Sequence, residues 1–305
     1  MVSVIMSTYN ENSEMICASV ESILNQTYSD IEFIIVIDNP KNVKLCDLLE
    51  KYASNDNRIT LIYNKKNMGL VASLNLALKY THGAYIARMD ADDIALPNRI
   101  NIQLDYLNKN NLDIVGGLTK YIDENEQGTG RQSPYYREED IPKVILHESC
   151  IPHPTWLVKS EVYSKLKGYR YIDSCEDYDF LLRAIKTGYR IGLCDCVVLY
   201  YRINLSGISK TKAFKQFLSF HFLSNNHNKI DKISEENLNV YLNRNNTRRN
   251  EKNFLSARAA MNRVLDHNLR RIERCGALII AVFVSRYHFM KLIDLVIAKR
   301  YRRFI

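Results

Sequence analysis

The sequence predicts an α/β protein built on an open, mostly parallel twisted sheet with helices on its faces. Three observations support this class. Strand and helix signals alternate through the first half, the strand signals are continuously apolar runs such as "IEFIIVID", and polar clusters follow several of them. Apolar strands without a polar face are typical of parallel sheets covered on both sides. Strand–helix alternation is the pattern from which such sheets are built.

The elements of the first half are expected in a regular order. The run "VSVIMS" predicts a strand, and "NENSEMICASVESILNQ" predicts a helix with Ile16, Val20 and Ile23 at helical spacing and Asn12 or Ser13 as its cap. Further strands are expected at "IEFIIVID", "RITLIY" and "AYIARM". Helices are expected around residues 43–52 and 70–78, and a third one begins near Pro97.

Residues 111–205 give a less regular pattern. "DIVGG" and "TKYID" predict two strands, and "ENEQGTGRQSPYYREED" predicts a long polar loop. "SEVYSKLKGY" predicts a short helix that ends at a glycine, and "EDYDFLLRAIKTG" a longer one with Gly188 as its C-cap. The run "YRIGLCDCVVLYYR" predicts the strand that closes this part of the chain.

The charge of the chain is divided unevenly between its two parts. Residues 1–200 hold 21 Lys and Arg against 27 Asp and Glu, whereas residues 201–305 hold 21 against 7. We therefore divide the chain into a body, residues 1–210, and a helical, basic C-terminal region, residues 211–305. The apolar run from Ala277 to Val284 is too short to span a bilayer. A helix at the membrane interface, ending in "KRYRR" and facing anionic lipid, fits this region better.

The composition is that of a globular protein, with 46% apolar and 25% charged residues. The seven cysteines are scattered without a C-x-x-C pair, which favours reduced thiols in a reducing compartment. The N-terminus shows no cleavable signal pattern. We expect a cytoplasmic protein that lies peripherally on the inner face of the plasma membrane.

The stretch "MDADD" places three carboxylates directly after an apolar strand. Asp90 and Asp92 can point the same way in an extended or tightly turned segment, and Asp93 can orient a neighbour. Hard divalent cations such as Mg²⁺ and Mn²⁺ prefer carboxylate and phosphate oxygens. The cluster predicts a site for one of these ions, and an exposed acidic turn is the alternative.

Polar residues also follow the first two strands. Thr8, Tyr9 and Glu11 can line a base pocket in which Tyr9 stacks on a ring, or they can form a turn and a helix cap. Asp38 can accept an N–H group of a nucleobase, or it can cap the next turn. Ligands of open α/β sheets bind beyond the carboxyl ends of the strands. The sequence contains neither G-x-G-x-x-G nor G-x-x-x-x-G-K-[ST], so a bound nucleotide needs a cation for its phosphates.

Several segments together resemble the family 2 glycosyltransferases of GT-A fold. These segments are "VSVIMSTYNE", "SVESILNQTYSDIEFIIVID", "NMGLVASLNLAL" and "GAYIARMDADDIALPNRI", followed by "HPTWLVKSEVYSKLKGY" and "CEDYDFLLRA". The resemblance covers about residues 1–205, with the segments in order. One departure is "IDNP", where the family often shows "DDGS", so Ile37 replaces the first acid and Asp38 retains the second.

The resemblance implies a role for each of these motifs. Thr8, Tyr9, Glu11 and Asp38 would hold a uridine, and Asp90 and Asp92 would contact the ribose, the metal and the diphosphate. Asp93 is a third candidate ligand of Mn²⁺ or Mg²⁺.

Asp177 would be the catalytic base that removes the proton of the acceptor hydroxyl, at a helix N-terminus that favours its ionised form. Glu176 would orient it. The alternative is that these acids only stabilise the first turn of a helix.

Three further residues have two interpretations each. His153 and Trp156, in "IPHPTW", lie either near the acceptor or in a proline-braced turn with Trp156 in the core. Arg202 either reaches the diphosphate or is an ordinary surface arginine.

The sequence thus predicts an inverting, metal-dependent glycosyltransferase. It would move a hexose or N-acetylhexosamine from a UDP-sugar to a saccharide acceptor, namely a lipid-linked intermediate of O-antigen or capsule synthesis. One alternative is a nucleotidyltransferase of related fold, although "STYNENSEM" lacks the basic residues that a triphosphate needs. The other is a nucleic-acid-binding protein that uses the basic region. Its aromatic residues do not form a stacking surface, so no nucleic acid partner is expected.

Overall fold

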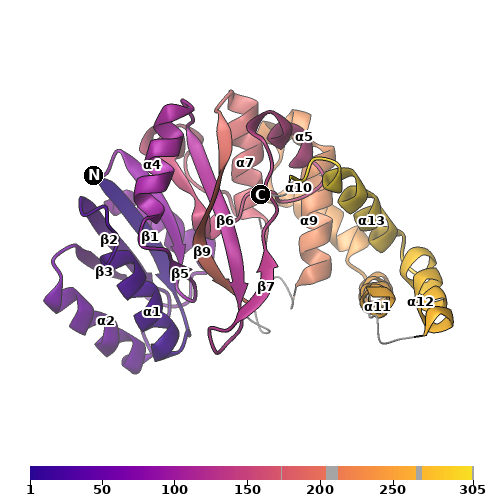
Figure 1. Cartoon of the computed structure of the whole chain (residues 1–305), viewed down its shortest axis with the longest axis horizontal. Helices are drawn as coiled ribbons and strands as arrows, with labels where there is room; N and C mark the ends of the chain where they lie inside the picture. Colours follow the sequence, from indigo (N-terminus) through magenta and orange to yellow (C-terminus); the bar gives the residue numbers. More distant parts are fainter. Residues whose placement is uncertain (173, 204–211, 266–269, 304–305) are drawn as a thin grey trace.

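The computed structural model describes residues 1–172, 174–203, 212–265 and 270–303. One nine-stranded sheet forms the centre of the body (Figure 1), with the strand order β3-β2-β1-β4-β8-β6-β9-β5 and with β7 paired to β6. The longer pairings, β1 with β2 and β4, β2 with β3, and β6 with β9, are parallel. The predicted α/β class with a mostly parallel sheet is confirmed.

The first half has the predicted alternation of strands and helices. The elements are β1 (Val2–Thr8), α1 (Ser13–Leu24), β2 (Ile31–Ile37), α2 (Val43–Asn55), β3 (Ile59–Tyr63), α3 (Leu70–Ala77) with a 3₁₀ turn η1 (Leu78–Tyr80), and β4 (Tyr85–Asp90). Asn12 caps α1, as expected, because its side chain accepts from the amide of Met15. The helix after Pro97 begins at Arg99.

The second half contains strands that the sequence pattern did not reveal. Its elements are β5 (Ile94–Ala95), α4 (Arg99–Lys109), β6 (Ile114–Ile122), β7 (Gly128–Gln132), η2 (Glu138–Asp140), α5 (Ile141–Val144), η3 (His153–Thr155), β8 (Leu157–Lys159), α6 (Ser160–Leu166), α7 (Glu176–Thr187) and β9 (Ile191–Arg202). The two strands expected within residues 112–123 are one strand, β6, and the expected polar loop contains β7. Gly188 ends α7 in the left-handed conformation, as predicted.

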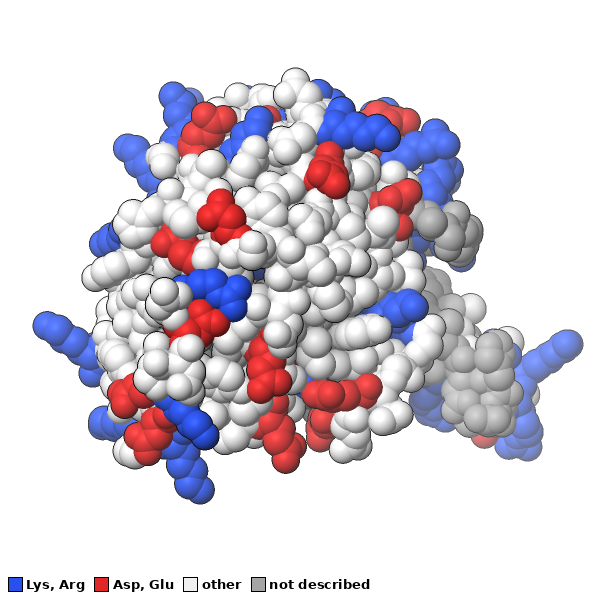
Figure 2. Space-filling model, turned by 60° about the vertical axis from the view of Figure 1, so that its left-hand side comes forward, with Lys and Arg blue, Asp and Glu red and all other residues white. Residues whose placement is uncertain are grey.

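Apolar side chains bury both faces of the sheet, which explains its continuously apolar strands. Val4 and Met6 of β1 belong to the cluster formed with α1, α2 and α4. Ile5, between them, points to the opposite cluster, which includes residues of α3, α6 and α7. Alternate residues of a strand face opposite sides, so β1 supplies residues to two cores. Acidic and basic side chains are interspersed over the outer surface of the body shown in Figure 2.

The basic C-terminal region is helical, as predicted. It comprises α9 (Ala213–Asn225), η4 (His227–Lys232), α10 (Glu235–Asn245), α11 (Arg248–Leu265), α12 (Arg271–Phe283) and α13 (Arg286–Lys299). Phe214, Phe217 and Leu238 belong to the same apolar cluster as α7 of the body. The boundary proposed between residues 210 and 211 lies outside the described residues.

Within the described residues, no single helix has the length and apolar composition of a membrane span. Only α12 and α13 taken together pass that test, and their axes differ by 102°. The seven cysteines carry no disulfide.

Candidate active site

The carboxyl ends of three parallel strands bring the first predicted site residues together. In β1, Thr8 lies opposite Ile37 of β2 and Ser7 lies opposite Asp90 of β4. The amide of Asp38 donates to the carbonyl of Thr8 at 2.8 Å. Thr8, Asp38 and Asp90 therefore lie together at one edge of the sheet, the edge at which ligands of open α/β sheets bind.

The turn after β1 is closed by the carboxylate of Glu11. Its Oε2 accepts from Thr8 Oγ1 at 2.6 Å and from the amide of Tyr9 at 2.8 Å. The ring of Tyr9 is 42% exposed at this edge, which leaves a face for stacking. The charge of Glu11 contributes to the raised pKa of Asp92, so this turn lies near the acidic residues after β4.

Asp38 organises the loop that leads into α3. Its carboxylate is 3% exposed and accepts from Asn64 Nδ2 at 2.6 Å and from the amides of Met68 and Gly69 at 2.7 and 2.8 Å. Gly69 has φ +83°, a conformation that favours glycine. Asp38 thus holds the loop before α3 and not the turn that directly follows it, which Asn39 and Asn42 bind instead. Its contact with a nucleobase stays a prediction.

The three carboxylates after β4 form a compact cluster. One oxygen from each of Asp90, Asp92 and Asp93 lies within 4.8 Å of the other two. Burial, together with the charges of Asp90 and Glu11, raises the pKa of Asp92 to about 7. Burial and the charges of Asp90 and Asp92 raise the pKa of Asp93 well above its usual range.

These residues fit a hard divalent cation. The donor set is all carboxylate oxygen, as Mn²⁺ and Mg²⁺ prefer. Asp93 Oδ2 is buried and has no hydrogen-bond partner among the described residues. Carboxylates that lie close together and have raised pKa values repel one another when ionised, so a bound cation stabilises their ionised forms. The alternative of an exposed acidic turn is wrong, because Asp93 is 1% exposed.

Arg88 is a residue of this site that the sequence reasoning missed. It lies in β4, two residues before Asp90 and therefore on the same face of the strand. Its guanidinium forms an ion pair with Asp90, while its Nε and Nη1 are buried without a partner among the described residues. The charge of Arg88 also acts on Asp93, His153 and Asp177. The sequence did contain a signal for this role, since Arg88 is the one charged residue inside the apolar run "AYIARM" that precedes the acids.

Arg202 holds the acidic segment from behind. It is 2% exposed, so the expectation of a surface arginine is wrong. Its amide donates to Asp93 Oδ1 at 2.8 Å, its Nε donates to the carbonyl of Asp92 at 2.8 Å, and its Nη2 pairs with Glu126 at 2.8 Å. Because these bonds engage the guanidinium within the protein, Arg202 positions the acids instead of extending a free cation toward a diphosphate.

Asp177 lies in the first turn of α7, within electrostatic reach of the acidic cluster. Burial raises the pKa of its carboxyl group, the amide of Tyr178 and the charge of Arg88 lower it, and Asp90 raises it. Its Oδ1 accepts from the amide of Tyr178 at 2.7 Å. We expected the helix N-terminus to favour the ionised form of this carboxylate. Burial has the larger effect on its pKa, which is raised. Residues 90 and 177, far apart in sequence, thus share one electrostatic environment.

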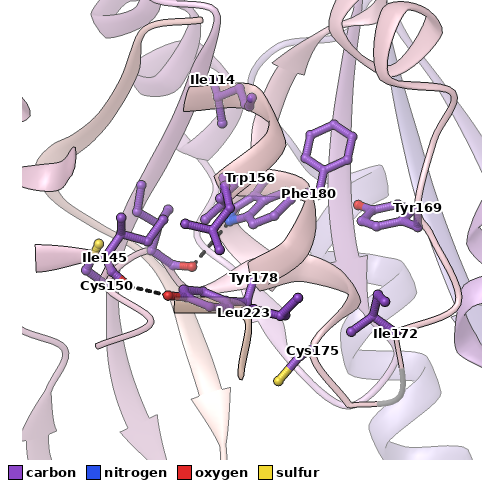
Figure 3. Close-up of a cluster of buried hydrophobic side chains, with 14 of the residues drawn as sticks. Ile114, Ile145, Cys150, Trp156, Tyr169, Ile172, Cys175, Tyr178, Phe180 and Leu223 are labelled. Carbon is purple, nitrogen blue, oxygen red and sulfur yellow. Dashed lines mark hydrogen bonds between the residues drawn. The ribbon is translucent and has the colours of Figure 1, made fainter. Parts of the chain in front are cut away.

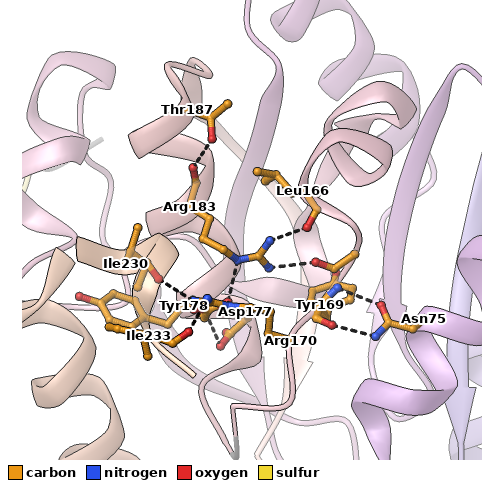
Figure 4. Close-up of polar contacts among 12 residues, drawn as sticks. Asn75, Leu166, Tyr169, Arg170, Asp177, Tyr178, Arg183, Thr187, Ile230 and Ile233 are labelled. Atoms are coloured by element: carbon orange, nitrogen blue, oxygen red, sulfur yellow. Dashed lines mark hydrogen bonds and ion pairs between the residues drawn. The ribbon is translucent and has the colours of Figure 1, made fainter. Parts of the chain in front are cut away.

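The start of α7 is anchored by a buried charge network. Asp179 is fully buried and pairs with Arg170 and with Arg183, whose Nε lies 2.8 Å from Asp179 Oδ2. Figure 4 shows how these arginines also reach main-chain carbonyls, Arg183 to Leu166 at 2.7 Å and Arg170 to Ile230 at 3.1 Å. Glu176, in the same turn, is buried as well. Asp179 therefore stabilises the helix start, whereas the pKa of Asp177 responds to the charge of Asp90.

Trp156 belongs to the core and not to an acceptor surface. Its side chain is fully buried, donates from Nε1 to the carbonyl of Ile151 at 3.3 Å, and packs against Phe180 (Figure 3). The interpretation of Trp156 as an acceptor contact is corrected on this ground.

His153 is also buried, and its Nε2 lies 2.9 Å from the hydroxyl of Tyr169. Burial and the nearby Arg88 hold the pKa of His153 well below its usual range, so the imidazole is neutral.

Comparison with known sequences places these motifs in a family context. Residues 3–167 match the profile of Glycosyl transferase family 2. An uncharacterised glycosyltransferase of Methanocaldococcus jannaschii is 38% identical over 74% of this chain and 81% of its own length. The O-antigen biosynthesis glycosyltransferase WbnJ of Escherichia coli is 35% identical over 69% of this chain and 83% of its own length. The E. coli UDP-Glc:alpha-D-GlcNAc-diphosphoundecaprenol beta-1,3-glucosyltransferase WfgD is 35% identical, over 71% and 82%.

Solved structures share the fold at lower sequence identity. S. aureus TarS (residues 1–349), in complex with UDP-GlcNAc, matches with a TM-score of 0.61 at 19% identity, over 98% of this chain and 89% of that one. The mannosyltransferase PcManGT of Pyrobaculum calidifontis, in complex with GDP-Man and Mn²⁺, matches with a TM-score of 0.58 at 16% identity, over 97% and 86%. Neither the nucleotidyltransferase nor the nucleic-acid-binding alternative is favoured by these similarities.

Proposed function

The chain belongs to glycosyl transferase family 2 and is a glycosyltransferase of GT-A fold, and on that premise we propose that it transfers a hexose or N-acetylhexosamine from a UDP-sugar to a saccharide acceptor by an inverting, metal-dependent reaction. The observation that supports the proposal is that the turn after β1 and the acids after β4 lie at one edge of the sheet, and that the charge of Asp90 acts on Asp177 of α7. Each of these three groups has a separate task.

The uridine is held by the residues after β1 and β2. Tyr9 stacks on the base with its exposed ring, and Thr8 and Glu11 fix the turn that presents it. Asp38 holds the adjoining loop through two main-chain amides, and its carboxylate accepts a further hydrogen bond from an N–H group of the base. The complex of the structural neighbour TarS with UDP-GlcNAc supports a nucleotide sugar as donor.

Asp90, Asp92 and Asp93 would hold a Mn²⁺ or Mg²⁺ ion. Such an ion supplies Lewis-acid stabilisation of the negative charge on the leaving diphosphate. The protein's own contribution is to keep the three carboxylates together: Arg88 pairs with Asp90 from within β4, and Arg202 binds the backbone of Asp92 and the side chain of Asp93. The complex of the structural neighbour PcManGT with GDP-Man and Mn²⁺ supports a divalent cation as the bound ion.

Asp177 acts as the general base. It takes the proton of the acceptor hydroxyl as that oxygen attacks the anomeric carbon and the bond to the diphosphate breaks. A raised pKa makes this carboxylate a stronger base than an ordinary aspartate. Glu176, buried in the same turn, orients it. A single in-line displacement inverts the anomeric centre, so an α-linked donor gives a β-linked product.

The acceptor is a lipid-linked saccharide of O-antigen or capsule assembly. The names of two relatives support this: WbnJ is an O-antigen biosynthesis enzyme, and WfgD acts on GlcNAc-diphosphoundecaprenol. An acceptor with a polyprenyl chain lies in a membrane. The chain would therefore work as a cytoplasmic, peripheral protein on the inner face of the plasma membrane, with its basic C-terminal helices toward anionic lipid.

A donor panel tests the proposal. The full-length protein is incubated with detergent-dispersed GlcNAc-diphosphoundecaprenol and one UDP-sugar at a time, with Mn²⁺ or with a chelator, and released UDP is measured. We expect UDP release with at least one donor, dependent on both acceptor and Mn²⁺, and a β-linked product by NMR. UDP release that persists in the chelator overturns the metal assignment. An α-linked product from an α-linked donor overturns the inverting mechanism.

A further inference from the structure

Helix α12 carries a row of large apolar side chains in water. Ile272, Ile279 and Phe283 are 77%, 61% and 80% exposed. Spacings of seven and four residues place these side chains on one face of the helix. Ala277 and Ala281, on the opposite face, are buried, and α12 packs there against α11. The exposed row is therefore the face that remains after α12 has made its contacts within the protein.

Helix α13 repeats this arrangement. Phe289, Ile293 and Val296 are 44%, 44% and 59% exposed, and spacings of four and three residues place them on one face. The inner face of the helix is bound to the protein, because Tyr287 and Ala298 are in the core and Asp294 lies 2.8 Å from His147 Nδ1. We call the six exposed residues of α12 and α13 the apolar rows.

The apolar rows are bordered by cations. Residues 270–303 contain nine Lys and Arg and only two acids, Glu273 and Asp294. Both acids have partners, since Glu273 pairs with Arg270 and Asp294 with His147. Arg286 and Arg300, at the two ends of α13, are exposed and have the same helical phase as its apolar row, while Arg271 is exposed at the start of α12.

The chemistry of this surface distinguishes among possible partners. Exposed apolar rows bordered by arginine and lysine are the features with which helices bind in the interface of anionic bilayers. A nucleic acid would bind the cations and leave the isoleucines and phenylalanines in water. A second copy docked through the same surface would bring its cations against these cations, and the two acids of residues 270–303 already have partners.

We propose that the apolar rows dock on an anionic lipid monolayer, with their side chains at the level of the acyl boundary and the bordering cations at the headgroups. The inference rests on the proposed function only in that a lipid-linked acceptor would lie in the same bilayer. Figure 1 shows α12 and α13 at the end of the molecule remote from α2. This placement leaves the apolar rows free to meet a membrane.

Vesicle flotation of the full-length protein tests the surface. The vesicles contain phosphatidylglycerol with phosphatidylethanolamine, or phosphatidylcholine alone. The variants are the pair Ile279→Asp with Phe283→Asp in α12, the pair Phe289→Asp with Ile293→Asp in α13, and the control Val43→Asp. Val43 is 64% exposed on α2, far from the apolar rows. Thermal unfolding of each variant confirms that it is folded.

We expect the wild type and Val43→Asp to float with the anionic vesicles and much less with phosphatidylcholine. The partition coefficient of each pair variant onto anionic vesicles should be at least roughly tenfold lower than that of the wild type. The reason is that two apolar side chains no longer move from water into the bilayer. Equal flotation of wild type and both pair variants overturns the proposal. A defect in only one pair overturns the two-helix surface. Binding to DNA in place of vesicles, or a dimer that the pair variants abolish, assigns the surface to another partner and also overturns it.

The result is separable from the proposed function. UDP release with a detergent-dispersed acceptor does not require vesicles, so the pair variants should keep it. If the wild type floats but releases no UDP with any donor, the proposed function fails and the membrane surface stands. If UDP is released in detergent but the protein does not float, the surface fails and the proposed function stands.

Discussion

Arg88 is the cation on which the acidic cluster depends while no metal is bound. Its side chain is 3% exposed, and its partner Asp90 is 30% exposed. Replacing Arg88 by Met leaves Asp90 unpaired among two other carboxylates. We expect a loss of roughly 3 kcal/mol in the free energy of unfolding. This is the lower end of the range for breaking a buried ion pair, because Asp90 is partly solvated.

Chemical denaturation measures the effect of Arg88→Met. Arg137→Met is the matched control, because Arg137 and its partner Glu139 are 56% and 70% exposed and should contribute at most about 1 kcal/mol. Similar losses in the two variants would show that Arg88 does not support the cluster.

Asp92 gives the metal-free protein a pH dependence with a defined sign. Its pKa is raised to about 7 by burial, Asp90 and Glu11, and an unfolded aspartate titrates near 4. The stability from this group is present below about pH 4 and is lost as the pH rises through about 7. A bound cation favours the ionised carboxylate, so Mn²⁺ should raise the melting temperature more at about pH 8 than at about pH 6.

A thermal shift series in Mn²⁺ checks this expectation, with Asp92→Asn as the variant that should lose the part of the pH dependence that Asp92 contributes. A wild-type shift that is equal at both pH values would exclude Asp92 as a ligand.

The roles of single residues were only partly predictable from the sequence. Asp90, Asp92 and Asp93 were identifiable because acids after an apolar strand need a cation or solvent. Arg88 and Arg202 were not, because their partners come from segments that lie together only in the fold, such as Asp92 and Glu126 around Arg202.

Helix α7 carries Asp177, the proposed base, in its first turn, and Asp179 holds the start of that helix. Asp179→Asn leaves Arg170 and Arg183 without their shared carboxylate. We expect a loss of about 3–5 kcal/mol in the free energy of unfolding, together with a loss of activity. Asp177→Asn should keep or raise stability, because burial disfavours the ionised form of Asp177.

Denaturation and UDP release, measured on both variants, separate the two roles. Unchanged stability in Asp179→Asn would contradict its anchoring role.

Whole elements were predictable where their periodicity is strong. The strands β1, β2 and β4 are buried on both faces, and α1, α2 and α7 have regular apolar faces and caps, so local sequence specifies them. Strand β7 is exposed at every residue and contains two glycines, so only its pairing with β6 makes it a strand. Strand β8 has three residues, which are too few to show the alternating pattern of a strand.

At the scale of the molecule, charge and chemistry are divided between two parts. The body holds the acids of the sheet edge and Asp177, on which the charge of Asp90 acts. The C-terminal helices carry the basic charge and the apolar rows. The sequence predicted this division from its charges. It did not predict that α9 and α10 share a core with α7, because those contacts join distant segments.

The central claim is that residues from distant segments form one site for a UDP-sugar, with Asp177 as its base. The most direct test measures UDP binding and turnover side by side in the wild type and Asp177→Asn, with the donor found active. We predict that turnover falls roughly 10²–10⁴-fold while the affinity for UDP in Mn²⁺ changes by less than about threefold. Turnover close to that of the wild type, or loss of UDP binding in the variant, would contradict the claim.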